Sequence, residues 1–226
     1  MNIVFIGLGG GGTIVANSIA RYMFFRDNKD ELITLTFIDG DEYEQKNNVR
    51  QIFRGYGNKA EVKAKELQEE FGDRLNFQIF PEFINSENAN RLIVDGDVVF
   101  SCVDNHKTRK VISDHCSKLN NCVLISGGNE YTDGNIQTYV RKDGENLAPT
   151  IDQYHPEIEF PKDKSPEDLS CEELVEVGTP QLFFMNMLVS VYMCASFYNV
   201  IETHKIHPEV YVDLVKMESA SRMRCI

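Results

Sequence analysis

A run of glycines near the start of the chain has the composition of a phosphate-binding turn. Residues 7–12 read G-L-G-G-G-G and contain the pattern G-x-G-x-x-G. The turn follows a short apolar strand predicted for residues 2–6 and precedes a helix predicted for residues 13–25. Glycines let backbone N–H groups approach a phosphate, and the positive end of the helix dipole favours the anion. We therefore predict nucleotide binding rather than an empty strand-to-helix turn, with contacts from Gly7, Gly9, Gly10 and Gly12.

A carboxylate stands where the ribose of such a nucleotide would lie. Asp39 directly follows a β-rich stretch at residues 33–38, and an acid at the end of the second strand can accept hydrogen bonds from ribose hydroxyls. It lies 27 residues after Gly12, further than is usual, and the polar residues 26–31 accommodate the extra length as a loop. NAD, FAD and ATP suit these features equally, because a fold does not select its chemistry.

Two further stretches select among these nucleotides. Residues 39–51 read D-G-D-E-Y-E-Q-K-N-N-V-R-Q, and residues 58–64 read N-K-A-E-V-K-A. The first resembles the D-x-D-x-V-x-x-x-N-x-x-R-Q signature of the ThiF/MoeB/HesA family, the ubiquitin-activating-enzyme-like adenylyltransferases. The second resembles the K-x-E-V-x-A element of that family, and a simple dehydrogenase has no reason to carry either. The positions that match are Asp39, Asp41, Asn47, Arg50, Gln51 and Lys59.

The resemblance implies an ATP site with defined roles. It assigns Asp39 to the ribose, Arg50 and Lys59 to the phosphates, and Asp41, Asn47 and Gln51 to the same nucleotide site. Joining a carboxylate to the α-phosphate of ATP brings two anions together, and cationic groups aimed at the phosphates stabilise the charge that develops. Arginine can fork onto phosphate oxygens, whereas lysine offers a mobile point charge. Either residue alone would be interpreted as part of a solvated face; in register with Asp39 they indicate a site.

A second acidic position suits a magnesium ion. Residues 101–105 read S-C-V-D-N and resemble the C-x-D-N element of the family, which assigns Asp104 to Mg²⁺. Asp104 ends a strand predicted for residues 97–102, and open α/β sheets bind ligands at the carboxyl ends of their strands. Mg²⁺ prefers oxygen ligands and shares them with substrate phosphates. Alternatively, Asp104 caps the helix predicted for residues 107–119, and both roles are compatible. Arg109 in that helix also matches the family and is expected to be structural.

Two departures from the family pattern concern basic residues. The spacing from Arg50 to Lys59 is shorter than in MoeB-like proteins, and Lys63 lies at the longer spacing, but the surrounding K-A-E-V favours Lys59. The sequence begins directly at the first strand, without the helix that supplies an arginine to the partner's ATP in relatives. Arg54 is a candidate to replace that arginine.

A thiol step is a separate question. Relatives that go beyond adenylation use a cysteine in a crossing loop to attack the acyl-adenylate, and Cys171 is the only cysteine within residues 141–178. It precedes a Gly-x-Pro turn at residues 178–180, although at a longer spacing than in the family. Its acidic neighbours raise the pKa of a thiol and weaken it as a nucleophile. A catalytic cysteine and an incidental loop cysteine therefore both stay open.

The order of predicted elements indicates a Rossmann-like α/β fold. Strand and helix alternate along the first part of the chain, which favours a mainly parallel sheet flanked by helices. We expect one ThiF-type adenylation domain over residues 1–226, with a long crossing loop at residues 141–178 that is rich in Pro, Asp, Glu and Lys. The remaining predicted elements are a helix at residues 59–71 and strands at residues 77–80, 122–125 and 135–140.

Composition restricts the partners and the compartment. The formal net charge of −12 argues against a nucleic-acid surface. Six cysteines without a C-x-x-C pair argue against a zinc site, and the absence of a basic leader predicts a reducing, cytoplasmic location. Residues 181–201 carry no charge and are long enough to span a bilayer. Four polar residues interrupt them, however, so we predict a helix buried against a sheet or a dimer partner and no membrane span.

The resemblance implies an ATP- and Mg²⁺-dependent adenylyltransferase. Its expected substrate is the C-terminal carboxylate of a ubiquitin-like or sulphur-carrier protein, and the family implies a homodimer. A variant of this hypothesis has a free peptide or a carboxylate on a modified RNA base as acceptor. Two alternatives of another class are a non-catalytic nucleotide-binding subunit of an activating complex and an NAD-binding redox protein.

Overall fold

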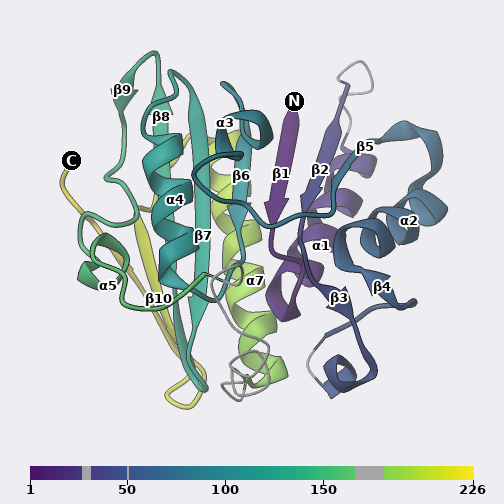
Figure 1. Cartoon of the computed structure of the whole chain (residues 1–226). Coiled ribbons are helices and arrows are strands. Elements are labelled where there is room, and N and C mark those ends of the chain that lie inside the picture. The colour runs from purple at the N-terminus through teal and green to yellow at the C-terminus, as the bar shows by residue number, and fades with distance from the viewer. Residues whose placement is uncertain (27–31, 50, 166–180) are drawn as a thin grey trace.

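The computed structural model of the chain describes residues 1–26, 32–49, 51–165 and 181–226 (Figure 1). In this part of the chain one mixed sheet has the strand order β11-β10-β8-β7-β6-β1-β2-β5, with β9 paired to β8. The parallel strands are β1 (Asn2–Ile6), β2 (Thr34–Ile38), β5 (Asn76–Phe80), β6 (Val98–Ser101) and β7 (Cys122–Asn129). The antiparallel strands are β8 (Asp133–Lys142), β9 (Glu145–Asn146), β10 (Glu209–Asp213) and β11 (Glu218–Arg222). The prediction of a mainly parallel sheet flanked by helices is confirmed.

The strand order creates a crevice at the carboxyl edge of the sheet. β1 lies between β2 and β6, so the chain first builds outward through β2 and β5 and then returns to build the other half through β6 and β7. The connections after β1 and β6 therefore diverge to opposite halves of the sheet. Ligands of open α/β sheets bind at such a reversal, outside the carboxyl ends of the strands.

Helices cover both faces of the sheet (Figure 1). One face packs against α1 (Gly10–Phe25), α2 (Lys59–Phe71) and α7 (Phe183–Tyr198). The opposite face packs against α3 (Ala89–Leu92) and α4 (His106–Cys116), with α5 (Pro156–Glu159) beside α4. Side chains of β1 alternate between the two cores: Phe5 faces α1 and Ile6 faces α4. A central strand buried on both sides explains why β1 is a continuous apolar run.

Aromatic stacking aligns the central strands. The ring of Phe5 stacks on Phe37 of β2 and on Phe100 of β6, with ring centroids 5.3 Å apart in both pairs. These are register partners in the parallel ladders, so three neighbouring strands place identical side chains side by side. The stack fixes the ends of β1, β2 and β6 at one level, and the connections that follow them start from the same edge.

α7 is the uncharged helix at residues 181–201 that the sequence predicts. It packs against α1, β7, β8 and β10, and ends in a π-helical turn at Asn199–Thr203. The Ser190 hydroxyl donates to the Gly11 carbonyl at 3.1 Å. A Cβ added to Gly127 would lie 2.3 Å from the sulfur of Met193, so glycine is needed where β7 meets α7. The prediction that this helix packs against the sheet is confirmed, although its outer side is exposed. By length and composition alone, Phe183–Thr203 also qualifies as a membrane-spanning helix.

The structure departs from the sequence prediction at several places. α1 begins at Gly10, three residues earlier than predicted, because the glycines themselves form its first turn. The β10–β11 hairpin was not predicted, since β11 reads E-S-A-S-R and has no apolar alternation. β7 and β8 are longer than predicted and form a hairpin. The crossing loop is not structureless where it is described, since residues 141–165 contain the end of β8, β9 and α5.

Candidate nucleotide-binding site

The glycine turn joins β1 to α1 at the crevice and admits no side chain at its two ends. Gly7 has φ +85°, and a Cβ there would lie 2.9 Å from the Cys102 carbonyl oxygen. A Cβ on Gly12 would lie 1.9 Å from the Gly7 carbonyl oxygen. The turn therefore closes on itself and on the end of β6, which brings the connections after β1 and β6 into contact.

The N-terminus of α1 is built to receive an anion. Gly9 is the N-cap and makes no side-chain cap, so the first-turn amides, which include Gly10, have no partner within the helix. Gln51 lies opposite, with its Nε2 3.8 Å from the Cβ position of Gly9. The Gln51 side chain is buried, and its Oε1 has no hydrogen-bond partner among the described residues. The unpaired first-turn amides fit a bound phosphate group, whereas the Gln51 oxygen, an acceptor, would need a hydroxyl or N–H donor of a ligand.

Asp39 links the glycine turn to the segment that follows β2. Its carboxylate accepts from the Leu8 backbone N–H at 2.5 Å and from the Asp41 backbone N–H at 2.8 Å. Burial raises the pKa of Asp39, and the nearby Lys59 ammonium opposes that shift. Each carboxylate oxygen accepts one of these bonds and keeps a second lone pair. Asp39 can therefore hold the turn and still accept hydrogen bonds from ribose hydroxyls.

A small antiparallel ribbon carries Lys59 to the same edge. β3 (Glu42–Tyr43) pairs with β4 (Gly57–Asn58), and Lys59 is the first residue of α2. The Lys59 Nζ lies 2.9 Å from the Asp41 carboxylate, and the two backbones also bond at 2.9 Å. The side chain of Lys59 is largely buried, whereas that of Asp41 is half-exposed. The structure thus brings together three of the predicted residues, Asp39, Asp41 and Lys59.

Lys63 does not belong to this group. It lies one turn further along α2, fully buried, with its Nζ 3.3 Å from the Asn17 side chain and 2.5 Å from Glu66. Burial lowers the pKa of Lys63, and Glu66 counteracts that shift. The choice of Lys59 over Lys63 therefore agrees with the geometry. Arg54, the candidate for the missing arginine, is exposed, and its backbone N–H bonds to the Glu66 carboxylate.

The remaining motif residues after β2 divide into two groups. Asn47 is buried in a 3₁₀ turn at Gln45–Val49, where its side-chain oxygen accepts from the Glu44 backbone N–H at 2.8 Å. It holds the turn that leads to Gln51, whose own side chain reaches the glycine turn. Arg50 and Cys171 lie outside the described residues, so their roles stay predictions.

Asp104 follows β6 beside the glycine turn and is exposed. The interpretation of Asp104 as a helix cap is wrong, because the cap of α4 is Asn105, whose side chain accepts from the Thr108 backbone N–H at 2.8 Å. The Asp104 carboxylate therefore keeps its oxygens for a ligand. Among the described residues no group of three or more His, Cys, Asp or Glu side chains forms a metal site. A magnesium ion at Asp104 would take its other ligands from phosphates and water.

Arg109 has the structural role expected of it. It is buried, and its guanidinium donates to the Val103 carbonyl at 2.8 Å and to the Gly127 carbonyl at 2.9 Å. Burial lowers the pKa of Arg109, and the Asp104 carboxylate opposes that shift. Arg109 thus ties the segment that carries Asp104 to β7.

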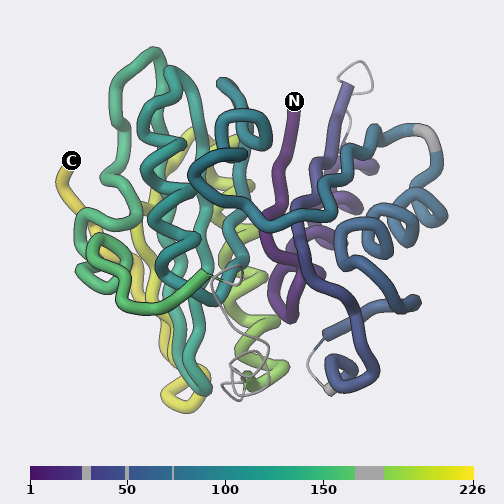
Figure 2. Tube along the Cα trace, viewed as in Figure 1, coloured from purple at the N-terminus to yellow at the C-terminus, as the bar shows by residue number. Residues whose placement is uncertain are grey.

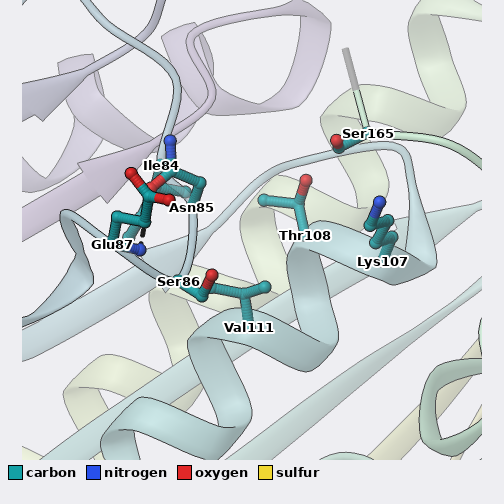
Figure 3. A pocket seen from close by; sticks show the side chains of 8 residues that line it. All are labelled: Ile84, Asn85, Ser86, Glu87, Lys107, Thr108, Val111 and Ser165. Carbon is teal, nitrogen blue, oxygen red and sulfur yellow. Dashed lines mark hydrogen bonds between the residues drawn. The ribbon is translucent and has the colours of Figure 1, made fainter. Parts of the chain in front are cut away.

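A pocket of about 300 Å³ lies beside the connection that packs on the turn after Asp39. Its walls are the connection after β5 and the first turns of α4 (Figure 3), and Figure 2 shows that connection crossing the sheet toward α3. The ring of Phe83 lies where a Cβ of Gly40 would be, at 2.6 Å, so the connection packs directly on the turn after Asp39. Thr108 Oγ1 is buried without a hydrogen-bond partner among the described residues. The lining residues are Ile84, Asn85, Ser86, Glu87, Lys107, Thr108, Val111 and Ser165.

The described part of the crossing loop is held by several contacts, of which those of His155 and Asp163 lie nearest to its end. His155 lies between two carboxylates, with Nδ1 2.8 Å from Glu157 and Nε2 2.7 Å from Glu209 on β10. Arg224 donates to the other Glu209 oxygen at 2.5 Å. Burial acts to raise the pKa of Glu209, but hydrogen bonds including those to Arg224 and His155 outweigh it and lower that pKa. Further along, the Asp163 carboxylate accepts from the first two backbone N–H groups of α4, at 2.5 and 3.1 Å.

The family follows from a comparison that spans nearly the whole chain. The family model described as "ThiF family" matches residues 1–224. This chain belongs to the ThiF family. The recognition made from residues 39–51 and 58–64 is therefore confirmed.

Curated relatives match part of the chain. "Adenylyltransferase and sulfurtransferase MOCS3" of Drosophila ananassae is 30% identical over 146 residues, 63% of this chain and 30% of the relative. "Adenylyltransferase and sulfurtransferase UBA4" of Meyerozyma guilliermondii is 25% identical over 114 residues, 49% of this chain and 27% of the relative. The chain thus spans about a third of the length of these relatives.

Solved structures agree with the fold. A crystal structure of E. coli MccB with ATP superposes with a TM-score of 0.68 at 17% identity and covers 98% of this chain and 63% of that chain. MccB with selenomethionyl MccA gives 0.69 at 18% identity with the same coverage. At these identities the likeness shows the fold alone.

Sequence reasoning missed two residues that organise the site. Asn58 accepts from the Ala60 and Glu61 backbone N–H groups, and its amide donates to the Asp39 carbonyl at 2.8 Å. Its signal was present, because Asn followed three residues later by Glu is a helix-start pattern. The Tyr43 hydroxyl donates to the Leu8 carbonyl at 2.8 Å. No pattern in the sequence around Tyr43 indicates that contact.

We predict that Lys59→Met lowers the affinity for ATP at least about tenfold, because a lost charge-assisted hydrogen bond is worth roughly 1.5–3 kcal/mol. Lys63→Met is the matched control. It removes a lysine that is buried away from the turn, so the affinity should stay within about twofold. Isothermal titration calorimetry measures both. A loss of ATP binding in Lys63→Met with normal binding in Lys59→Met would contradict this assignment.

Proposed function

We propose that this ThiF-family chain binds ATP with Mg²⁺ and adenylates the C-terminal carboxylate of a small ubiquitin-like or sulphur-carrier protein, releasing pyrophosphate. The observation that carries the proposal is the meeting of Asp39, Lys59 and the Asp104 segment around one glycine turn. The names of the relatives, which combine adenylyltransferase and sulfurtransferase, support the choice of acceptor.

The nucleotide extends along the carboxyl edge of the sheet. The phosphates lie on the first-turn amides of α1, the ribose hydroxyls donate to the Asp39 carboxylate, and the adenine enters the pocket between Ile84 and Val111. The pocket combines aliphatic walls with the polar groups of Asn85 and Thr108, as a base-binding site requires. Phe83, the neighbour of Ile84 in sequence, packs on Gly40, so one wall of the pocket adjoins the turn that follows Asp39.

Adenylation needs charge neutralisation more than covalent help. An oxygen of the acceptor carboxylate bonds to the α-phosphorus of ATP, and the bond from that phosphorus to the bridging oxygen breaks as pyrophosphate leaves. Lys59, held by Asp41 at the edge of the turn, neutralises the phosphates. We assign Arg50 to the phosphates as well, because it matches the arginine of the motif at residues 39–51. Asp104 is the residue that would hold Mg²⁺, which supplies positive charge to the phosphates when bound.

The other hypotheses make distinct predictions. A non-catalytic subunit would bind ATP without pyrophosphate exchange, and an NAD-binding redox protein would bind NAD in preference to ATP. A free peptide or a carboxylate on a modified RNA base would replace the carrier as the acceptor that supports exchange. The net charge of −12 disfavours the RNA substrate. A cytoplasmic location belongs to the proposal, because a sulphur- or ubiquitin-carrier pathway that uses ATP operates in a reducing compartment.

We also propose that the chain forms a homodimer through the outer face of α7. Phe184, Met187, Val191 and Tyr198 are 63%, 41%, 60% and 49% exposed and recur at helical spacing on one side. The polar residues Asn186, Ser190 and Ser196 are buried on the other side, against the sheet and α1. Because one side of α7 packs on the sheet and α1, only the apolar stripe on its other side is free to make a contact. Such a stripe fits a protein partner better than a bilayer, so we propose no membrane span.

We predict that Asp104→Asn and Arg50→Ala each lower Mg²⁺-dependent ATP–pyrophosphate exchange by about 100-fold or more, because each removes electrostatic stabilisation at the reacting phosphates. The assay contains a diglycine-ended carrier protein. Asp114→Asn, an exposed acid of α4 that pairs with Lys110, is the control and should retain exchange. No exchange with any carrier in the wild-type chain, alongside ATP binding, would reject the enzyme in favour of a non-catalytic subunit.

We predict that Val111→Trp fills the adenine pocket and weakens ATP binding roughly tenfold, since overpacking costs about 1–3 kcal/mol. Val111→Ile adds one methylene and should bind ATP nearly as the wild type does. Calorimetric titration distinguishes the two variants. Unchanged affinity in a folded Val111→Trp protein would place the base elsewhere.

We predict that Val191→Glu gives the mass of one chain in light scattering at micromolar concentration, whereas the wild-type chain gives the mass of a dimer. A charge at the centre of the stripe must be desolvated when the interface forms. Gln68→Glu, an exposed position on α2, is the control and should stay dimeric. A monomeric wild-type chain would refute the dimer.

A further inference from the structure

The last strand of the sheet is an open edge. β11 pairs with β10 on one side, and no described residue pairs with its other side. All five residues of Glu218–Arg222 are exposed, so no helix covers either face of the strand. An uncovered edge presents unpaired backbone N–H and C=O groups and is a template for another strand.

The residues that flank this edge are unusually exposed for apolar side chains. Met217, Met223 and Val215 are 86%, 81% and 73% exposed, the three highest values among large hydrophobic residues in the described part of the chain. They stand at the two ends of β11, Val215 and Met217 in the turn before it and Met223 directly after it. Exposed apolar groups gathered at one place mark an interaction surface.

The sequence of β11 is complementary to itself when one copy is reversed. Residues 217–223 read M-E-S-A-S-R-M. An antiparallel pairing of two copies about a two-fold axis at Ala220 sets Glu218 opposite the second copy's Arg222 and Ser219 opposite its Ser221. Both oppositely charged pairs then lie on one face of the ribbon, and the methionines meet at its two ends. Directly opposed opposite charges stabilise antiparallel pairs, whereas like charges destabilise them.

The other edge of the sheet lacks this property. β5 reads N-F-Q-I-F over Asn76–Phe80 and contains no charged residue, so reversal gives it no complementary pair. α2 also packs against β5. The self-complementary pattern is therefore particular to the edge that no helix covers.

We infer that β11 is a docking edge for a second copy of this chain, in which two β11 strands pair antiparallel about Ala220 and join the two sheets into one. This contact is separate from the outer face of α7 and does not depend on nucleotide chemistry. Each copy contributes one short strand, so the contact belongs to the weak class of interfaces. It adds to any dimer formed through α7 and makes the mass rise with concentration.

The experiment exploits the two reversed charges. Glu218→Arg alone sets Arg against Arg, and Arg222→Glu alone sets Glu against Glu. In analytical ultracentrifugation each variant should therefore lose the rise of mass with concentration that exceeds the dimer formed through α7. An equal mixture restores both opposite-charge pairs, because one copy presents two arginines and the other two glutamates. The mixture should therefore associate at least as well as the wild type. The measurements use about 0.15 M salt, which screens charges further apart than about 8 Å and so weakens the repulsion between chains of net charge −12. The paired groups are closer than that, so their attraction persists.

Folding must be separated from pairing, because Arg222 also stacks over the Tyr211 ring at 4.3 Å. Thermal unfolding of each single variant provides that control, and the mixture makes the result independent of it. Variants that keep the wild-type mass dependence, or a mixture that associates no better than its components, would overturn the proposal. If the edge instead binds the carrier protein, only carrier affinity and not self-association would respond to the reversals, which would also overturn it.

A cross-link gives an independent measurement. Ala220→Cys, in a chain with Cys171→Ser and Cys225→Ser, places two thiols directly opposite at a Cα separation of about 4.5–5.5 Å, within the range of a disulfide. Val215→Cys in the same background is the control, since the turn lies far from the axis and should not cross-link. Equal cross-linking of the two variants, or none at position 220, would overturn the pairing.

Discussion

The site depends on one buried carboxylate that joins two parts of the chain. Asp39 accepts the Leu8 and Asp41 backbone N–H groups, so it connects the glycine turn after β1 to the ribbon after β2. The Lys59 ammonium pairs with Asp41 and opposes the rise in the pKa of Asp39. Without Asp39, the buried Leu8 N–H and the partly buried Asp41 N–H would lose their partner, and the loss of a buried hydrogen bond costs about 1–3 kcal/mol. The carboxylate that we predict to bind the ribose is thus also the anchor of the local fold.

The parts that sequence could predict are those in which the local chain dictates the contact. The glycine turn between β1 and α1, the position of Asp39 at the end of β2, and Lys59 at the start of α2 each follow from residues close in sequence. Their meeting follows from topology, since parallel strands end at one edge. The buried row of Phe5, Phe37 and Phe100 makes that edge level.

The parts that sequence could not predict depend on partners distant along the chain. Asp104 and Asn105 are both good helix caps, and only the backbone shows that Asn105 takes that position. Arg109 reaches Gly127, which is 18 residues away, and this contact fixes its structural role. β11 lacks apolar alternation, because it lies at an edge where neither face is buried, so the pattern that reveals a strand is absent.

α1 and α4 both begin at the carboxyl edge of the sheet, and of these two only α4 has its first-turn amides bound by a side chain distant in sequence. Asp163 lies on the N-terminus of α4 and acts as an intramolecular ligand, delivered by the loop that His155 and Glu209 hold in place. A tethered group has an effective concentration in the millimolar range or above, so a free anion at α4 must compete with it. The N-terminus of α1 has no such competitor among the described residues. The loop therefore occupies the N-terminus of α4 and leaves that of α1 available for the proposed triphosphate.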